Sequence, residues 1–167
     1  LRPVTVAFEP KGEFVAVGFT SGHVKFLDIN TFEDICSFAP TTDSVFDLKF
    51  SPSGDYLTCY DDSNHVLLFQ RTSKIDPSTM GDEANSPTNS LFTYLGRVHS
   101  HSRKITGLEF GFREGAENLV SVAEDRQVVE YDLDGSTVIG GVLPLAEQRP
   151  PALDLNAYPS AMMWAPV

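Results

Sequence analysis

A strand–turn–strand phrase occurs three times along this chain and limits the folds open to it. The best-preserved copy, LVSVAEDRQVVEYD at residues 119–132, consists of two short apolar strands joined by a tight turn around Asp125. Side chains of its second strand alternate between two faces, as they do in any β-strand. Weaker copies stand at residues 15–28 and 57–70. A recurring unit of this kind predicts a repeat architecture.

Aromatic residues mark the end of the first strand in each unit. Phe8 and Phe50 each lead into an x-Pro-x-Gly turn, in which Pro presets φ and Gly tolerates positive φ. Phe110 takes this place in the third unit and Trp164 in a fourth, so the aromatic anchors are spaced by 42, 60 and 54 residues. A period of roughly 40–45 residues is that of a four-stranded propeller blade, and the longer spacings predict insertions.

Short strands separated by turns account for the whole pattern, and no segment reads as a long helix. We expect strands at Val4–Phe8, Phe14–Phe19, Val24–Ile29, Asp34–Phe38, Val45–Phe50, Tyr56–Tyr60, His65–Arg71, Phe92–Val98, Ile105–Phe110, Leu119–Val122, Gln127–Leu133 and, more weakly, Val138–Leu143. An all-β chain of this kind folds as a sandwich, a barrel or a propeller. The recurrence of a four-strand phrase selects the β-propeller.

The repeats divide the chain into three blades and the beginning of a fourth. Their expected bounds are residues 1–43, 44–100, 101–149 and 150–167, the last opening with a strand at Ala161–Trp164. The second blade contains an insertion at 72–90, rich in Ser, Thr, Pro and Asn, which we expect to be a mobile surface loop. Propellers close with about 4–8 blades. We therefore expect a partial propeller whose remaining blades are missing from this chain.

At these positions the chain resembles the WD-repeat family. His101 precedes the first strand of the third unit, and Asp125 lies in its tight turn. Tyr131-Asp132 ends its third strand, where the family has Trp-Asp. The resemblance implies that such a His, turn Asp, strand hydroxyl and aromatic form a buried hydrogen-bonded cluster. The other units depart from the family pattern, and Ser63 stands where the second unit would have its turn Asp.

A narrower resemblance is to ciliary members of the family, carried by FVAVGFTSGHVKFLD, YLGRVHSHSRKITGLEFGF, LVSVAEDRQVVEYDL and YPSAMMWAPV. It implies a non-enzymatic scaffold of the calmodulin- and spoke-associated complex, at the base of a radial spoke on the ciliary or flagellar axoneme. Its implied partners are spoke-complex subunits, a calmodulin-containing complex and the doublet microtubule, and its role is in ciliary motility. A generic WD-repeat adaptor remains the alternative, either a microtubule-associated propeller or a substrate receptor of a ubiquitin ligase.

Catalytic and metal-binding patterns are weak throughout the sequence. His99 and His101 have no Cys, Asp or Glu at a matching ligand spacing, and Asp132–Ser136 lacks the Gly and Glu positions of a calcium loop. No Gly-rich phosphate loop or nucleophile elbow is present. We therefore predict no enzyme activity, no catalytic residue, no cofactor and no metal.

Charge narrows the class of partner. The net charge of −11 argues against nucleic acid or an anionic membrane as the main partner. The one basic run, residues 97–104, contains Arg97, Arg103 and Lys104. These side chains could contact an acidic protein surface such as that of tubulin, or they could be ordinary charges of a loop between blades.

Overall fold

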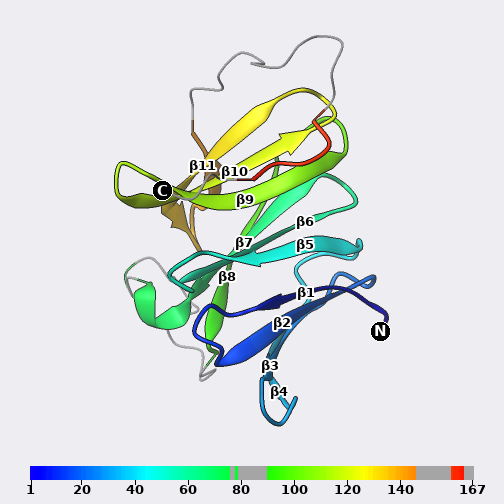
Figure 1. Cartoon of the computed structure of the whole chain (residues 1–167), viewed down its shortest axis with the longest axis vertical. Coiled ribbons are helices and arrows are strands. Elements are labelled where there is room, and N and C mark those ends of the chain that lie inside the picture. Colours follow the sequence, from blue (N-terminus) through cyan, green and yellow to red (C-terminus); the bar gives the residue numbers. More distant parts are fainter. Residues whose placement is uncertain (76–77, 79–89, 146–158, 164–167) are drawn as a thin grey trace.

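A computed structural model describes residues 1–75, 78, 90–145 and 159–163 and contains three four-stranded antiparallel sheets (Figure 1). The first sheet is β1 (Pro3–Phe8), β2 (Phe14–Phe19), β3 (Val24–Asp28) and β4 (Asp34–Phe38). The second is β5 (Val45–Phe50), β6 (Tyr56–Asp61), β7 (His65–Arg71) and β8 (Phe92–His99). The third is β9 (Ile105–Arg113), β10 (Ala116–Ala123), β11 (Val128–Thr137) and β12 (Gly141–Pro144).

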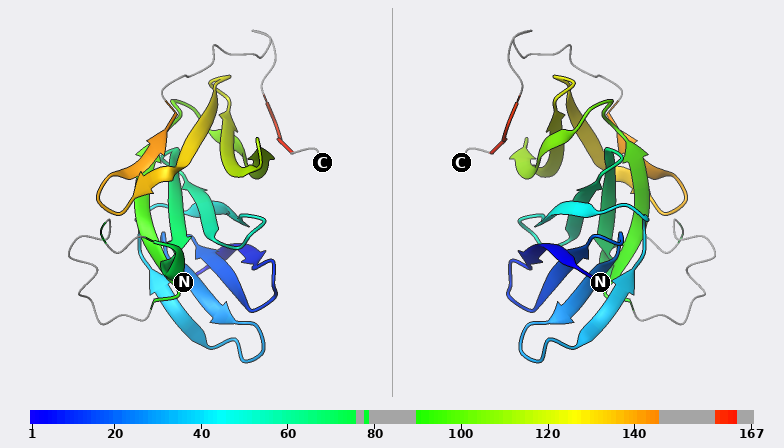
Figure 2. Two further views of the ribbon diagram at one scale, coloured as in Figure 1. Left: turned by 90° about the vertical axis from the view of Figure 1, so that its left-hand side faces the viewer. Right: turned by 90° about the vertical axis from the view of Figure 1, so that its right-hand side faces the viewer.

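Consecutive strands are neighbours within each sheet, so every sheet is one meander of the repeat. The sheets follow one another along the long axis of the molecule, as successive blades do (Figures 1 and 2). This confirms the predicted all-β, partial propeller fold. A single turn of 3-10 helix, η1 (Thr72–Lys74), follows β7. None of the helical structure in the described residues is long and apolar enough to cross a membrane.

The core consists of two apolar clusters, one at each junction between sheets. The cluster between the first and second sheets is aromatic: the Phe26 and Phe92 rings are stacked with centroids 4.8 Å apart, and Phe14 meets Phe50 edge-on at 5.7 Å. The cluster between the second and third sheets is largely aliphatic and includes Leu68. Side chains of one strand face alternate sides, so the second sheet contributes to both junctions.

The third sheet departs from the predicted strand bounds. β9 and β10 extend to Arg113 and from Ala116, and are joined by Glu114 (φ 53°) and Gly115 (φ 83°). Two positive φ angles make a tight hairpin turn that leaves the flanking strands paired, so the first strand continues past its predicted end at Phe110 and the second begins before its predicted start at Leu119. The third strand of this sheet was also predicted too short, because β11 continues past the predicted end at Leu133 to Thr137.

Two predicted segments lie largely outside the described residues. Of the insertion at 72–90, residues 76–77 and 79–89 are not described. Residues 159–163 belong to none of the sheets, and the Trp164 end of the predicted fourth-unit strand is not described. The segment runs beside β9, where a Cβ added to Gly107 would lie 3.0 Å from Met162 Cβ (Figure 2). The blade bounds at 1–43, 44–100, 101–149 and 150–167 stay predictions.

Candidate functional site

A buried polar cluster, formed by His101, Ser121, Asp125 and Tyr131 and here called the His101 cluster, joins the strands of the third sheet. His101 is 1% exposed; its Nε2 lies 2.7 Å from Ser121 Oγ and its Nδ1 3.1 Å from the Asp125 carboxylate. Ser121 Oγ is also 2.8 Å from Tyr131 Oη. Asp125 accepts two further bonds, from the backbone N–H groups of Ser102 and Gln127. His101, Asp125 and Tyr131, which the sequence singled out, thus meet in one cluster, together with Ser121, which it did not.

Proton positions in the His101 cluster follow from its acceptors. A carboxylate only accepts, so His101 Nδ1–H donates to Asp125. On a neutral ring Nε2 then accepts from the Ser121 hydroxyl, which leaves Tyr131 as the donor to Ser121. Burial lowers the pKa of His101 against the opposing effect of Asp125, and burial raises the pKa of Tyr131 to about 12. The imidazole of His101 and the phenol of Tyr131 are therefore held in their uncharged forms beside the Asp125 carboxylate.

The order Ser–His–Asp in this cluster is that of an acyl-transfer triad. Here, however, Ser121 is 0% exposed, and its Oγ is bonded to both His101 and Tyr131. A substrate carbonyl would have to displace Tyr131 from the interior of the sheet to reach it. The arrangement therefore holds strands together rather than presenting a nucleophile to solvent.

A second acid cluster lies at the matching end of the second sheet, and the sequence did not reveal it. Asp61 has a fully buried side chain that accepts from Thr41 Oγ1 at 3.1 Å, from the backbone N–H of Ser63 and from that of His65. Thr41 stands four residues before β5, as His101 stands four residues before β9. The predicted turn position, Ser63, instead donates to Asp43 at 2.6 Å. The pair Asp61-Asp62 was the signal available in the sequence.

The predicted basic contact residues separate into two groups. Arg97 is paired with residues next to and within the second sheet. Its Nη1 lies 3.0 Å from Thr41 Oγ1 and 3.6 Å from the buried Asp61 carboxylate. Arg103 and Lys104 are exposed in the connection between β8 and β9. Arg97 is therefore paired within its own sheet although its side chain is 42% exposed, and Arg103 and Lys104 are exposed in the connection.

Beside Lys104 lies a cavity of about 370 Å³, here called the loop cavity. Its lining residues are Phe46, Tyr60, Asp61, Asp62, Asn64 and Lys104. The Phe46 and Tyr60 rings lie 5.8 Å apart, and Asp62 is exposed at the rim. Aromatic surface next to charges of both signs suits a peptide contact better than a small-molecule pocket.

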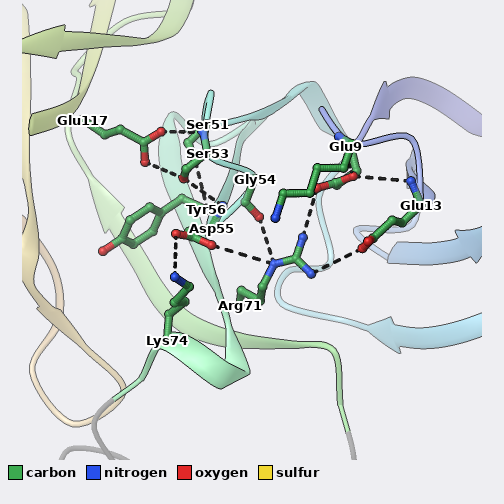
Figure 3. A network of polar contacts seen from close by, with 11 residues as sticks. Glu9, Glu13, Ser51, Ser53, Gly54, Asp55, Tyr56, Arg71, Lys74 and Glu117 are labelled. Carbon is green, nitrogen blue, oxygen red and sulfur yellow. Dashed lines mark hydrogen bonds and ion pairs between the residues drawn. The ribbon is translucent and has the colours of Figure 1, made fainter.

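Arg71, at the end of β7 opposite the turn that follows Asp61, joins the second sheet to the first (Figure 3). Its Nη2 lies 3.0 Å from Glu9 Oε1, and its guanidinium carbon lies 5.3 Å from the centroid of the Phe14 ring. The Glu9 side chain is fully buried and that of Arg71 is 12% exposed. Gly54 (φ +79°) makes room, since a Cβ there would be 2.6 Å from Glu9 Oε1.

The aromatic anchors differ in burial for a simple geometric reason. Phe50 and Phe110 pack into the junction with the preceding sheet, and Phe110 is 6% exposed. Phe8 is 64% exposed, because no described sheet precedes the first. Asp132 lies in β11 and accepts from the Gly135 N–H, and Trp164 lies outside the described residues.

Comparison with protein-family models gives one match, described as WD domain, G-beta repeat, over residues 32–69. That segment runs from the end of the first repeat into β7. The match therefore agrees with the resemblance seen in the sequence and with the four-stranded sheets.

Among curated proteins, the chain is similar to Cilia- and flagella-associated protein 251 of Chlamydomonas reinhardtii, at 30% identity over 82% of the chain. It is also similar to the Pongo abelii protein of the same name, at 26% identity over 97% of the chain. A further relative is the 77 kDa echinoderm microtubule-associated protein of Lytechinus variegatus, at 22% identity over 82% of the chain. The chain spans 16%, 13% and 18% of the lengths of these relatives.

Solved structures show the same fold at low identity. The RRP9 WD40 repeats superpose with a TM-score of 0.59 at 17% identity, covering 86% of this chain and 38% of that one. The β-propeller domain of Cps50 (Swd1) from Myceliophteria thermophila gives 0.58 at 12% identity, covering 80% and 41%. At such identities the likeness concerns the fold alone.

Proposed function

We propose that this WD-repeat β-propeller chain acts as a non-enzymatic protein–protein interaction scaffold of the cilium or flagellum. The observation that carries the proposal is its similarity to the Cilia- and flagella-associated protein 251 sequences over 82% and 97% of its length. The finer form of the proposal places the chain on the axoneme at the base of a radial spoke. There it would join spoke-complex subunits, a calmodulin-containing complex and the doublet microtubule.

The described surface supports a scaffold by what it offers to a partner. The polar clusters that resemble catalytic groups are buried and hydrogen-bonded within their sheets. Arg103 and Lys104 are exposed, and Lys104 lines the loop cavity together with the aromatic pair Phe46 and Tyr60. Aromatic and basic groups together are typical of protein interfaces, and basic ones attract an acidic partner.

Localisation tests the proposal directly. The chain, expressed with a fluorescent tag in Chlamydomonas reinhardtii, is expected in the flagella and should stay with the axoneme after detergent removes the membrane. The same tag alone is the control. A chain that remains in the cell body, or that leaves the flagella with the detergent extract, contradicts the proposal.

A microtubule-associated propeller acting outside cilia is the second candidate, favoured by the similarity to the 77 kDa echinoderm microtubule-associated protein. Co-sedimentation of the purified chain with microtubules separates the two candidates. Strong binding to plain microtubules together with labelling of cytoplasmic microtubules would favour this reading. Retention on axonemes without binding to plain microtubules favours the ciliary scaffold.

Arg103 and Lys104 provide a surface test of the proposed contact. Replacing both by Glu reverses two exposed charges, and is expected to weaken axoneme binding severalfold while leaving the fold intact. The matched control replaces Arg2 and Lys11 by Glu, because these residues are also exposed and basic but lie elsewhere on the chain. Equal effects of the two double variants would assign the binding to overall charge and remove this contact from the proposal.

A further inference from the structure

The loop cavity lies at the seam between the second and third sheets. Phe46 and Tyr60 stand opposite each other in the β5–β6 pair, and Tyr60 packs against the apolar cluster between these two sheets. Lys104, directly before β9, supplies the wall on the side of the third sheet. The cavity is therefore built between two described sheets and not on the outer face of the first or the third.

An aromatic residue at this place distinguishes the second sheet from the first. Tyr60 pairs with Val66 across β6 and β7 as Gly18 pairs with Val24 across β2 and β3, so Tyr60 and Gly18 hold corresponding places. At Gly18 the next sheet closes the space, because an added Cβ would lie 2.7 Å from Val45 Cγ2. At Tyr60 a half-buried ring stands there instead and forms part of the cavity wall.

The turn that borders the cavity has a tied backbone and unpaired side chains. Asp62 N–H donates to Ser44 O at 3.2 Å, which holds the turn against the start of β5. Within the described residues, no hydrogen bond or ion pair is made by the Tyr60 hydroxyl or by the side chains of Asp62, Asn64 and Lys104. Four polar groups around one cavity are thus held in place and available to a ligand.

Charges of both signs decide which kind of side chain fits. The exposed Lys104 ammonium repels a basic side chain, and the exposed Asp62 carboxylate repels an acidic one. A neutral aromatic side chain with a polar hydrogen suits both groups. Its ring face attracts an ammonium, and its N–H or O–H donates to a carboxylate, so tryptophan and tyrosine fit where phenylalanine lacks the donor.

The Phe46 and Tyr60 rings offer the apolar part of such a site. Their centroids lie 5.8 Å apart and their planes are inclined by 34°. Aromatic rings attract one another at centroid distances of about 4.5–7 Å, so a third ring can pack against this pair. The cavity volume of about 370 Å³ lies near the lower end of the roughly 300–1,000 Å³ of small-molecule sites. It therefore suits a single inserted side chain.

We propose that the loop cavity receives one tryptophan or tyrosine side chain from an extended segment of a partner protein. The inserted ring packs on Phe46 and Tyr60, its face meets Lys104, and its N–H or O–H donates to Asp62. Asn64 then bonds the backbone of the same segment, since an amide both donates and accepts. Aromatic side chains seated in pockets carry much of the affinity of protein interfaces. This contact deepens the scaffold function and rests on it, because it names one group through which the chain recognises a partner.

A fluorine NMR titration tests the assignment. The probe is the acetylated and amidated peptide Gly-Ser-Trp-Ser-Gly with fluorotryptophan at its centre, and it is titrated with the full 167-residue chain. Saturable binding is expected, and its absence at millimolar peptide overturns the proposal. Unlabelled peptides with Leu, Lys or Glu at the centre are expected to compete about tenfold more weakly than the tryptophan peptide. Equal competition by the leucine peptide overturns the assignment to an aromatic side chain.

Tyr60→Val removes the aromatic wall with little risk to the fold. It installs the residue that the third sheet has at the corresponding place, Val122, which pairs with Val128 as Tyr60 pairs with Val66. Binding is expected to weaken about tenfold. The matched control is Phe112→Val, because Phe112 is a strand aromatic, 50% exposed, at the far end of β9 from Lys104. Equal weakening by the two variants would mean unspecific apolar contact and overturn the proposal.

Two further readouts keep the test independent of folding and of localisation. Lys104→Gln keeps the aromatic wall and is expected to weaken binding about threefold, as loss of a cation–π contact does. In the unaltered chain, the ring signals of Phe46 and Tyr60 are expected to shift when the peptide is added, and binding that leaves them unmoved overturns the proposal. Because purified components are used, failure of the chain to reach the flagellum would count against the scaffold function and leave this result standing.

Discussion

The Asp125 carboxylate accepts hydrogen bonds from three different residues of the protein. The donors are the His101 ring and the backbone N–H groups of Ser102 and Gln127, so the carboxylate joins the two connections that flank β9 and β10. Asp125→Ala leaves these donors unpaired near the protein interior. We expect the free energy of unfolding to fall by about 1–3 kcal/mol, measured by urea denaturation.

The control for this change is Asp134→Ala, which removes an exposed acid from the same sheet. Its effect is expected to stay within about 0.5 kcal/mol. A fully stable Asp125→Ala chain that lost only partner binding would show that Asp125 serves recognition and not the fold.

His101 couples the stability of the third sheet to pH. Burial lowers its pKa below the ordinary value of 6.5, so the folded chain holds the ring neutral more strongly than the unfolded chain does. The unfolded state therefore binds more protons as the pH falls through and below 6.5, and stability decreases in that direction. Urea denaturation between pH 7.5 and 5.5 should show the decrease.

Substitution identifies His101 as the source of this pH dependence. His101→Gln is expected to flatten the profile, because it removes the buried ring whose pKa is lowered in the folded chain. A decrease of the same size in the His101→Gln chain would assign the effect to other groups.

At the scale of strands, the local sequence pattern predicted where most strands lie. It did not predict how one sheet packs on another. The predicted strands Phe14–Phe19, Asp34–Phe38, Val45–Phe50 and His65–Arg71 have the observed bounds. The strands of the third sheet were predicted too short, because β9 and β10 are joined by a hairpin turn of only two residues, Glu114-Gly115.

The candidate sites also differ in how far the sequence could predict them. The His101 cluster was implied by the resemblance to the WD-repeat family, because His101, Asp125 and Tyr131 stand at the family's positions, but Ser121 was not identified as its hydroxyl. Asp61 could not be placed by that spacing, because Thr41 has replaced the histidine and the acid has moved two positions toward the start of the turn. The Arg71–Glu9 pair joins residues 62 positions apart, and only the packing of one sheet on another brings them together.

That pair holds the first two sheets together and predicts a large effect of a single substitution. Arg71→Met keeps much of the apolar stem but leaves the buried Glu9 carboxylate without its cation. Breaking a buried ion pair from one side costs about 3–5 kcal/mol, and we expect a loss of this order in the free energy of unfolding. Adding Glu9→Leu should recover much of it, because no unpaired charge then remains.

Lys25→Met provides the matched control within the first sheet. Lys25 pairs with Asp34, whose side chain is 55% exposed, and exposed pairs contribute about 0–1 kcal/mol. Comparable losses for Arg71→Met and Lys25→Met would show that the Arg71–Glu9 pair contributes no more than a surface contact.

Over the whole molecule, the three sheets bury two junctions and leave the outer face of the first sheet exposed. β1 is the edge strand of its sheet, and its outward side chains are apolar: Val4, Val6 and Phe8 are 39%, 58% and 64% exposed. Contiguous apolar surface on an edge strand favours association with another chain. We therefore expect the 167-residue chain to associate at rising concentration, measured by sedimentation velocity.

Val6→Lys combined with Phe8→Lys places two charges on this face and should shift the association to higher concentration, without loss of the fold because both side chains are already exposed. Ile139→Lys is the control: Ile139 is 70% exposed but lies between β11 and β12, away from the first sheet. If the Ile139→Lys chain loses association as fully as the double variant, the β1 face is not the surface involved. The expected order follows from geometry, since the exposed apolar side chains of β1 form one face, whereas Ile139 is a single side chain on a turn.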